Sequence, residues 1–205
     1  VIELGAILYS VEHATILETY STLIGDGGPD NPCEAINRIP AGALPSGTSA
    51  ALAWARVGAM AAQADAVLAH NAGFDLGFAP SDLGKPWICT KNDLRWPKQT
   101  KEQPSLVALA LEHDLGVAVA HRALADCDLI ARLLTRSREL GADLEALLRR
   151  GLRPKATFQA LVSFEERERA KAAGFQWEAA SKRWLRTMAL EDAAALDFAT
   201  RQVAA

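Results

Sequence analysis

One carboxylate, Asp75, lies inside the segment LAHNAGFDLGF, between Phe74 and Leu76, where almost every other side chain is apolar. Burial of an unpaired carboxylate costs several kcal/mol, so this placement needs a compensating partner. Asp75 therefore either caps a helix and faces water, or lies where a cation binds. The rest of the chain has to separate these two hypotheses.

A histidine and a second carboxylate supply further candidates in HRALADCDLIARLL, where Asp126 follows His121 by five positions. Five residues of a regular helix turn through about 500°, which would point the two side chains apart. If His121 lies in the loop before the helix, both can face one cleft. This arrangement suits a histidine that acts on a water beside a metal-binding carboxylate. Taken alone, a histidine such as His121 is more often a surface residue, and we expect Asp128, beside Asp126, to be a solvated helix acid.

The elements that would position these residues follow from hydrophobic periodicity and capping signals. Strands come first, and helices then alternate with short buried strands, which predicts an α/β layer architecture with a mixed sheet. The predicted strands are 2–8, 15–24, 66–70 and 87–90, a loop fills 25–45, and the predicted helices are 48–64, a short one carrying Asp75, 105–115 closed by Gly116, and 122–140 closed by Gly141.

The segment AHNAGFD (69–75), together with His121-x-x-x-x-Asp126, resembles the second and third motifs of the DnaQ-like 3′–5′ exonucleases of the histidine-bearing DEDD type (DEDDh). The resemblance covers residues 1–140, and VIELGAIL is similar to the strand that follows the first motif of this family. It implies an RNase H-like exonuclease fold, with a mixed sheet flanked by helices. It also implies an enzyme that degrades nucleic acid to 5′-mononucleotides.

The resemblance further implies roles for individual residues. Asp75 and Asp126 would be ligands of two Mg²⁺ or Mn²⁺ ions, and His121 would be the general base for the attacking water. Asn71 and Phe74 would lie near the bound 3′ end, although core packing explains Phe74 equally well. The implied partner is nucleic acid with a free 3′ end, single-stranded DNA in preference to RNA. A DNA polymerase or a repair protein stays open as a second partner.

The first motif of the family, Asp-x-Glu on the strand before VIELGAIL, does not occur in this sequence. Glu3 comes too late in the motif order to replace it, and we expect Glu3 to pack or to form a salt bridge. Because the motif supplies half of the carboxylates in the family, we expect this chain to be inactive or nearly so. A domain seldom begins inside its sheet, so we also expect the natural chain to extend upstream. The alternative is a catalytically inactive nucleic-acid-binding protein of the same fold.

Charge divides the chain into two parts. Residues 1–148 carry 11 Lys and Arg against 18 Asp and Glu, and residues 149–205 carry 11 against 7. We therefore predict an exonuclease domain over 1–148 that lacks its first strand, a linker over 149–156, and a small α+β module over 157–205. In the module, FQALVSF predicts a strand, EERERAKAAG a helix ended by Gly174, FQWEAASKRWLRTM a hairpin, and 191–202 a closing helix.

The C-terminal segment resembles small modules with the pattern K-x-x-G-[FA]-x-W-x(6)-W that are attached to nucleic-acid enzymes. One hypothesis is a contact with a single strand, with an aromatic side chain available for base stacking. The candidate contacts are Lys171, Lys182, Arg183 and Arg186. In the other hypothesis, which we favour for the tryptophans, Phe175, Trp177 and Trp184 form the core of a small domain.

Composition excludes several other classes. Half of the residues are hydrophobic and 23% are charged, as in globular proteins. The three cysteines are scattered, which argues against a disulfide framework or a zinc site and favours a cytoplasmic protein. No apolar run is long enough to span a membrane, and no glycine fingerprint or nucleophile elbow is present.

Overall fold

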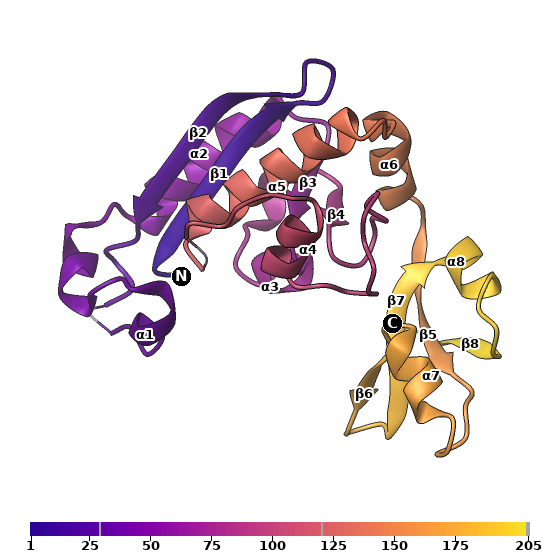
Figure 1. Cartoon of the computed structure of the whole chain (residues 1–205). Helices are drawn as coiled ribbons and strands as arrows, with labels where there is room; N and C mark the ends of the chain where they lie inside the picture. Colours follow the sequence, from indigo (N-terminus) through magenta and orange to yellow (C-terminus); the bar gives the residue numbers. More distant parts are fainter. Residues whose placement is uncertain (29, 120, 204–205) are drawn as a thin grey trace.

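The first two strands form an antiparallel hairpin that packs against the longest helix. In the computed structural model, which describes residues 1–28, 30–119 and 121–203, β1 (Glu3–Ser10) pairs with β2 (Thr15–Leu23). Helix α5 (Ala123–Glu139) lies against β1 (Figure 1). Gly5 permits this approach, because a Cβ atom there would lie 2.5 Å from the backbone nitrogen of Leu124.

A second pair of strands, β3 (Val67–Ala69) and β4 (Trp87–Cys89), is parallel. Helix α2 (Ala50–Ala62) precedes β3, and the Ser49 side chain caps it by accepting from the backbone N–H of Leu52. The remaining elements of this domain are α1 (Glu34–Asn37), η1 (Ala41–Ser46), α3 (Ala72–Leu76), η2 (Ser81–Leu83), α4 (Leu106–Glu112) and α6 (Leu144–Gly151).

The core of this front domain lies between α4, α5, α6 and β4, with Trp96 buried among them. The Trp96 indole N–H donates to the backbone oxygen of Thr90 at 2.9 Å, so its polar atom is satisfied. The buried members of this core are Ile88, Leu94, Trp96, Leu106, Leu109, Ala110, Leu129, Ile130, Leu133, Leu134 and Leu144.

Some elements of the front domain differ from the sequence predictions. The single mixed sheet is replaced, within the described residues, by two separate two-stranded sheets. Helix α4 ends at Glu112 rather than at Gly116, and the left-handed residue after it is Asp114, with φ of 60°. Helix α6 occupies part of the predicted linker 149–156, so the connection between α6 and β5 is only 152–154. Two features of the sequence could have predicted α6: Asp143, whose side chain caps the helix, and apolar residues at helical spacing.

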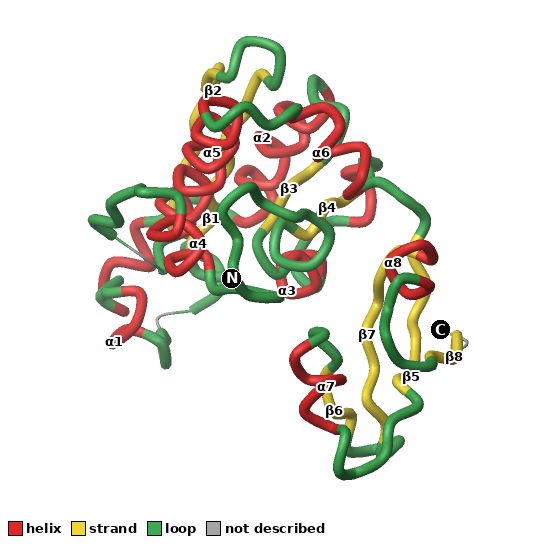
Figure 2. The backbone as a smooth tube through the Cα atoms, turned by 45° about the vertical axis from the view of Figure 1, so that its right-hand side comes forward, coloured by secondary structure: helices red, strands yellow, loops and turns green. Residues whose placement is uncertain are grey.

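The C-terminal residues fold into a four-stranded antiparallel sheet in the order β6-β7-β5-β8, apart from the strands of the front domain (Figure 2). Its elements are β5 (Lys155–Ala160), α7 (Arg167–Ala172), β6 (Gln176–Glu178), β7 (Arg183–Ala189), α8 (Leu190–Ala194) and β8 (Thr200–Val203). Its buried core consists of Phe158, Ala160, Ala170, Phe175, Met188 and Ala193.

Two sequence predictions for this segment are wrong. The predicted closing helix 191–202 is a short helix followed by strand β8, because residues 200–203 complete the sheet by pairing with β5. The predicted aromatic core contains Phe175 but not Trp177, whose side chain is 51% exposed. Phe158 and Phe198 pack around Phe175 instead, so the domain does not need Trp177 to close its core.

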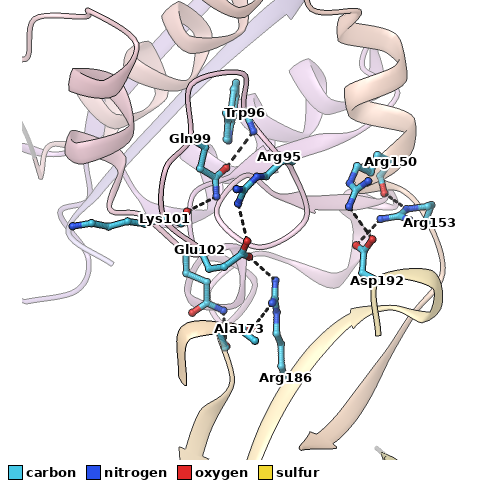
Figure 3. Close-up of polar contacts among 12 residues, drawn as sticks. Arg95, Trp96, Gln99, Lys101, Glu102, Arg150, Arg153, Ala173, Arg186 and Asp192 are labelled. Atoms are coloured by element: carbon cyan, nitrogen blue, oxygen red, sulfur yellow. Dashed lines mark hydrogen bonds and ion pairs between the residues drawn. The ribbon is translucent and has the colours of Figure 1, made fainter. Parts of the chain in front are cut away.

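Polar contacts join the two domains (Figure 3). Arg150 and Arg153 donate to the two carboxylate oxygens of Asp192 at 2.8 and 2.6 Å. Glu102 accepts from Arg95 at 2.7 Å and lies 3.5 Å from Arg186 of β7. The neighbouring Gln103 side chain donates to the backbone oxygen of Gly174 at 2.9 Å. The C-terminal domain therefore contacts the loop that precedes α4 and holds it in place.

Candidate active site

Asp75 lies on the short helix α3, which begins directly after β3. Asn71 forms the turn between them in a left-handed conformation, with φ of 75°, and its backbone oxygen accepts from the N–H of Phe74 at 2.9 Å. Asn and Asp tolerate this conformation better than most residues, which accounts for Asn at this point. The turn leaves Ala72 buried and the Asp75 side chain half-buried.

His70 fixes the entry to this turn. Its Nε2–H donates to the backbone oxygen of Pro104 at 3.0 Å, and its Nδ1 lies 3.1 Å from the Thr90 hydroxyl, which donates to it. Burial lowers the pKa of His70 below its ordinary value of 6.5, against the opposing effect of the bond to Pro104. The ring is therefore neutral, with both nitrogens satisfied. Sequence reasoning missed this role, although His70 stands within AHNAGFD.

His121 and Asp126 lie together at the N-terminal end of α5. His121 precedes the helix in a left-handed conformation, with φ of 62°, and its backbone N–H donates to Asp126 Oδ1 at 3.3 Å. The His121 side chain is exposed and the Asp126 side chain is half-buried in the first turn of the helix. Asp128, by contrast, faces solvent and lies 3.7 Å from Arg132.

The two carboxylates, Asp75 and Asp126, share one electrostatic environment. Burial raises the pKa of Asp75, and the charge of Asp126 raises it further. Burial also raises the pKa of Asp126, while the backbone N–H of His121 lowers it. Burial and both carboxylates raise the pKa of the Cys127 thiol to about 12, so this sulfur stays protonated. Within the described residues neither acid forms an ion pair with Lys, Arg or His. A bound cation would stabilise the charged form of both carboxylates.

Glu3 holds the start of α5 in place. Its carboxylate accepts from Arg122 Nη2 at 2.7 Å and from the backbone N–H of Ala123 at 2.8 Å. The Glu3 side chain is only 8% exposed. The sequence analysis expected Glu3 to pack or to form a salt bridge, and the pair with Arg122 confirms this. The partner could not be found from the sequence, because it lies 119 positions away.

An aromatic surface borders Asp75. Phe74 is 65% exposed, and its ring meets that of Phe78 edge-on, with centroids 5.1 Å apart. Core packing therefore does not explain Phe74, and that alternative is wrong. Asn71 is exposed at the start of the same helix. The rings leave an apolar surface beside a carboxylate, which can receive a flat organic group.

The candidate contacts of the C-terminal domain do not form one set. Lys182 lies at the end of the turn between β6 and β7, and Arg183 is the first residue of β7; both line the same groove as Trp177. Lys171 lies on α7, 3.8 Å from Glu168. Arg186 is only 12% exposed and is committed to Ala173 and Glu102. Arg186 therefore holds the domains together and does not present its charge to solvent.

The lowered pKa of His70 predicts a stability that depends on pH. An unfolded His takes up a proton near pH 6.5, whereas the folded ring resists it. The contribution of His70 to the free energy of unfolding is therefore fully present above pH 6.5. This contribution is lost as the pH falls below 6.5, by no more than about 1.4 kcal/mol per pH unit. In urea unfolding, the free energy of unfolding should fall less between pH 7.5 and pH 5.5 for His70→Gln than for the unchanged chain. Equal losses in the two proteins would contradict this assignment.

One solved structure is similar to this chain in fold over most of its length. The solved structure of "Exonuclease X in complex with 5′ overhanging duplex DNA" is similar, with a TM-score of 0.55 and 26% identity, over 74% of this chain and 90% of that chain. Residues 156–203 match the model of a domain family described as a domain of unknown function, DUF8626. No curated protein matches. The chain thus has a mixed α/β structure similar to that of an exonuclease. Within its described part, no helix is long and apolar enough to cross a bilayer.

Proposed function

We propose that the protein is a nuclease, specifically a metal-dependent 3′–5′ exonuclease that releases 5′-mononucleotides, with DNA preferred to RNA. The observation that carries the proposal is the pair Asp75 and Asp126, two half-buried carboxylates without an ion-pair partner among the described residues, in a chain similar to a DNA-bound exonuclease. Burial raises the pKa of both, and the charge of Asp126 raises that of Asp75 further. In this proposal the front domain, 1–148, is RNase H-like and performs the reaction. Residues 157–205 form its small α+β module.

The donor atoms at this site fit a hard divalent cation. Carboxylate oxygens are the ligands that Mg²⁺ and Mn²⁺ prefer, and Mg²⁺ is commonly bound through one or two carboxylates plus substrate phosphates. Asp75 and Asp126 would hold the metal, two ions in the complete site. Bound metal would activate water and stabilise the negative charge that develops on the transferred phosphate.

The remaining residues of the site would orient the substrate and move a proton. The His121 side chain is exposed beside Asp126, where its imidazole can reach a water and accept its proton as a general base. Its backbone N–H holds Asp126, which ties the proposed base to the proposed ligand. Phe74 offers a face on which the terminal base can stack, and Asn71 offers an amide for the sugar or phosphate.

We propose that this chain is impaired as an enzyme. Among the residues that the structure describes, no three or more His, Cys, Asp and Glu gather as a metal site. Two carboxylates do not neutralise two divalent cations, so the metals would be held weakly. The same observation favours a second candidate, a nucleic-acid-binding protein of this fold without catalysis. A DNA polymerase or repair protein is a further proposed partner.

Metal binding can be tested without activity, by thermal unfolding with and without Mn²⁺. Because the two acids are half-buried and close, Asp75→Asn and Asp126→Asn should each raise Tm in the absence of metal, by about 2–4 °C for each kcal/mol gained. Both variants should lose the rise in Tm that Mn²⁺ gives the unchanged chain. Asp128→Asn removes the same charge from the same helix and should keep that rise. A Mn²⁺ response that survives in both site variants would reject these ligands.

The reaction itself is tested with a single strand labelled at its 5′ end. We expect slow, Mn²⁺-dependent shortening by one nucleotide at a time, stopped by a chelator and absent in Asp126→Asn. A strand that ends in a 3′-phosphate should resist. Rapid shortening would contradict the proposed impairment, and products that start at the 5′ end would contradict the direction. Shortening that is absent while metal and DNA still bind would favour the binding protein.

A further inference from the structure

The surface of the C-terminal domain has a groove of about 250 Å³ between the segment after β5 and the β6–β7 hairpin. We propose that this groove binds single-stranded nucleic acid, by stacking one base on its aromatic side chains and pairing the flanking phosphates with its cations. The residues that carry the proposal are Phe164, Arg167, Trp177, Lys182, Arg183 and Trp184. A groove of this size is smaller than the roughly 300 Å³ and more that hold drug-sized ligands, and suits a single base.

The aromatic side chains are presented to solvent. Phe164 is 75% exposed and Trp177 is 51% exposed, in a domain whose core is closed by other residues. Trp177 and Trp184 are directly opposite across β6 and β7, with ring centroids 5.6 Å apart. Trp184 packs against the core and so supports the exposed ring. Large aromatic side chains kept in water without a structural need mark a binding surface.

The charge of the groove is positive. Its lining, as far as the structure describes it, contains Arg167, Lys182 and Arg183 and no acid. The Arg167 guanidinium lies 4.0 Å from the centre of the Phe164 ring, and it donates to the Phe164 backbone oxygen at 2.7 Å. Three acids lie nearby. Glu168 lies 3.7 Å from Arg167, Glu178 lies opposite Arg183 across β6 and β7 and accepts from the Ser181 hydroxyl, and Glu166 accepts from Arg169. Lys182 and Arg183 form no ion pair within the described residues, so these two cations in particular remain available to an anionic partner.

Aromatic faces and cations that line one groove match the chemistry of a single strand. Each base has a π-face, and each nucleotide adds one negative charge at a spacing that flexible Lys and Arg side chains can follow. An acidic peptide would satisfy the cations but would leave Trp177 and Phe164 without a stacking partner. The choice of nucleic acid agrees with the proposed function, but the groove is separate from Asp75 and Asp126. Either can therefore fail without the other.

Binding of a fluorescent fifteen-residue oligothymidine, measured by anisotropy with a chelator present, tests the groove without the metal site. Trp177→Ala should weaken binding by about 5-fold or more, whereas Trp177→Phe should retain most of it, because a stacking face remains. The double variant Lys182→Ala, Arg183→Ala should reduce the slope of log affinity against log salt by about 1.4. Lys171→Ala, which removes a charge outside the groove, should change the slope less than either groove residue.

Three outcomes would overturn the proposal. If Trp177→Ala and the unchanged chain bind the oligothymidine with equal affinity, no base stacks on Trp177. If the slope of log affinity against log salt falls as much for Lys171→Ala as for Arg183→Ala, the strand responds to the total charge of the domain and not to the groove. Displacement of the strand by a polyglutamate peptide at equal charge concentration would assign the groove to acidic peptides. If the groove variants do not change binding of the strand while Mn²⁺ still raises Tm through Asp75 and Asp126, the groove is rejected and the metal site stands. If the groove variants weaken binding of the strand but the Mn²⁺ response does not depend on Asp75 and Asp126, the metal site is rejected and the groove stands.

Discussion

Gly5→Ala should destabilise the front domain by about 2–3 kcal/mol, as overpacking of a rigid contact does. The added Cβ would lie 2.5 Å from the nitrogen of Leu124 and 2.6 Å from the carbonyl carbon of Ala123, both of them backbone atoms. Backbone cannot rotate aside as a side chain can, so the start of α5 has to move away from β1. Asp126 lies on that turn, and the variant should therefore also lose part of the Mn²⁺ response.

Urea unfolding measures the effect, and the chain offers a matched control. Gly58 lies inside helix α2, and a Cβ there would have no heavy atom within 4 Å. Gly58→Ala should therefore stabilise the protein by about 0.5–1 kcal/mol through helix propensity. The same substitution thus has opposite signs at the two positions. A Gly5→Ala protein as stable as the unchanged chain would contradict the close packing of β1 and α5.

Glu3→Ala should cost about 2 kcal/mol or more, because it removes a buried carboxylate that satisfies two groups at once. Arg122 would lose its partner, and the backbone N–H of Ala123 would lose its acceptor at the first turn of α5. Arg122 is 39% exposed, so water can replace part of the lost pairing, and the cost stays below that of a fully buried pair.

The control for Glu3 is Glu18, on the adjacent strand. Glu18 pairs with Arg56, whose side chain is 53% exposed. Exposed pairs contribute about 0–1 kcal/mol, so Glu18→Ala should have little effect on unfolding by urea. Glu3→Ala should in addition weaken Mn²⁺ binding, because Glu3 positions the helix turn that carries Asp126. Similar costs for the two variants would show that Glu3 acts as an ordinary surface acid.

The motifs of the front domain were visible in the sequence because local chemistry determines them. The resemblance of AHNAGFD and His121-x-x-x-x-Asp126 to two motifs of a known family selected Asp75, His121 and Asp126. The structure brings the charge of Asp126 within reach of Asp75 and the His121 backbone N–H onto Asp126. Helix α2 was predicted over 48–64 and runs over Ala50–Ala62, and Gly141, predicted to close the helix over 122–140, follows α5 with φ of 87°. Such features depend on a few neighbouring residues.

Features that depend on distant partners could not be predicted in this way. The pattern of apolar residues identifies strands but not which strands pair, so one mixed sheet was expected where two small sheets occur. Whether an aromatic side chain is covered depends on the whole fold, and both Phe74 and Trp177 were open questions until their exposure was known. The pair between Glu3 and Arg122 joins residues at opposite ends of the front domain.

The central claim, that Asp75 and Asp126 hold a divalent metal which in turn holds a 3′ end, is tested most directly by Mn²⁺ titration followed by electron paramagnetic resonance. We predict that a single strand with a 3′-hydroxyl tightens Mn²⁺ binding and that Mn²⁺ tightens binding of the strand by the same factor, as linkage requires. The double variant Asp75→Asn, Asp126→Asn should show neither effect. Equal Mn²⁺ affinity in the double variant and the unchanged chain, with or without the strand, would contradict the account.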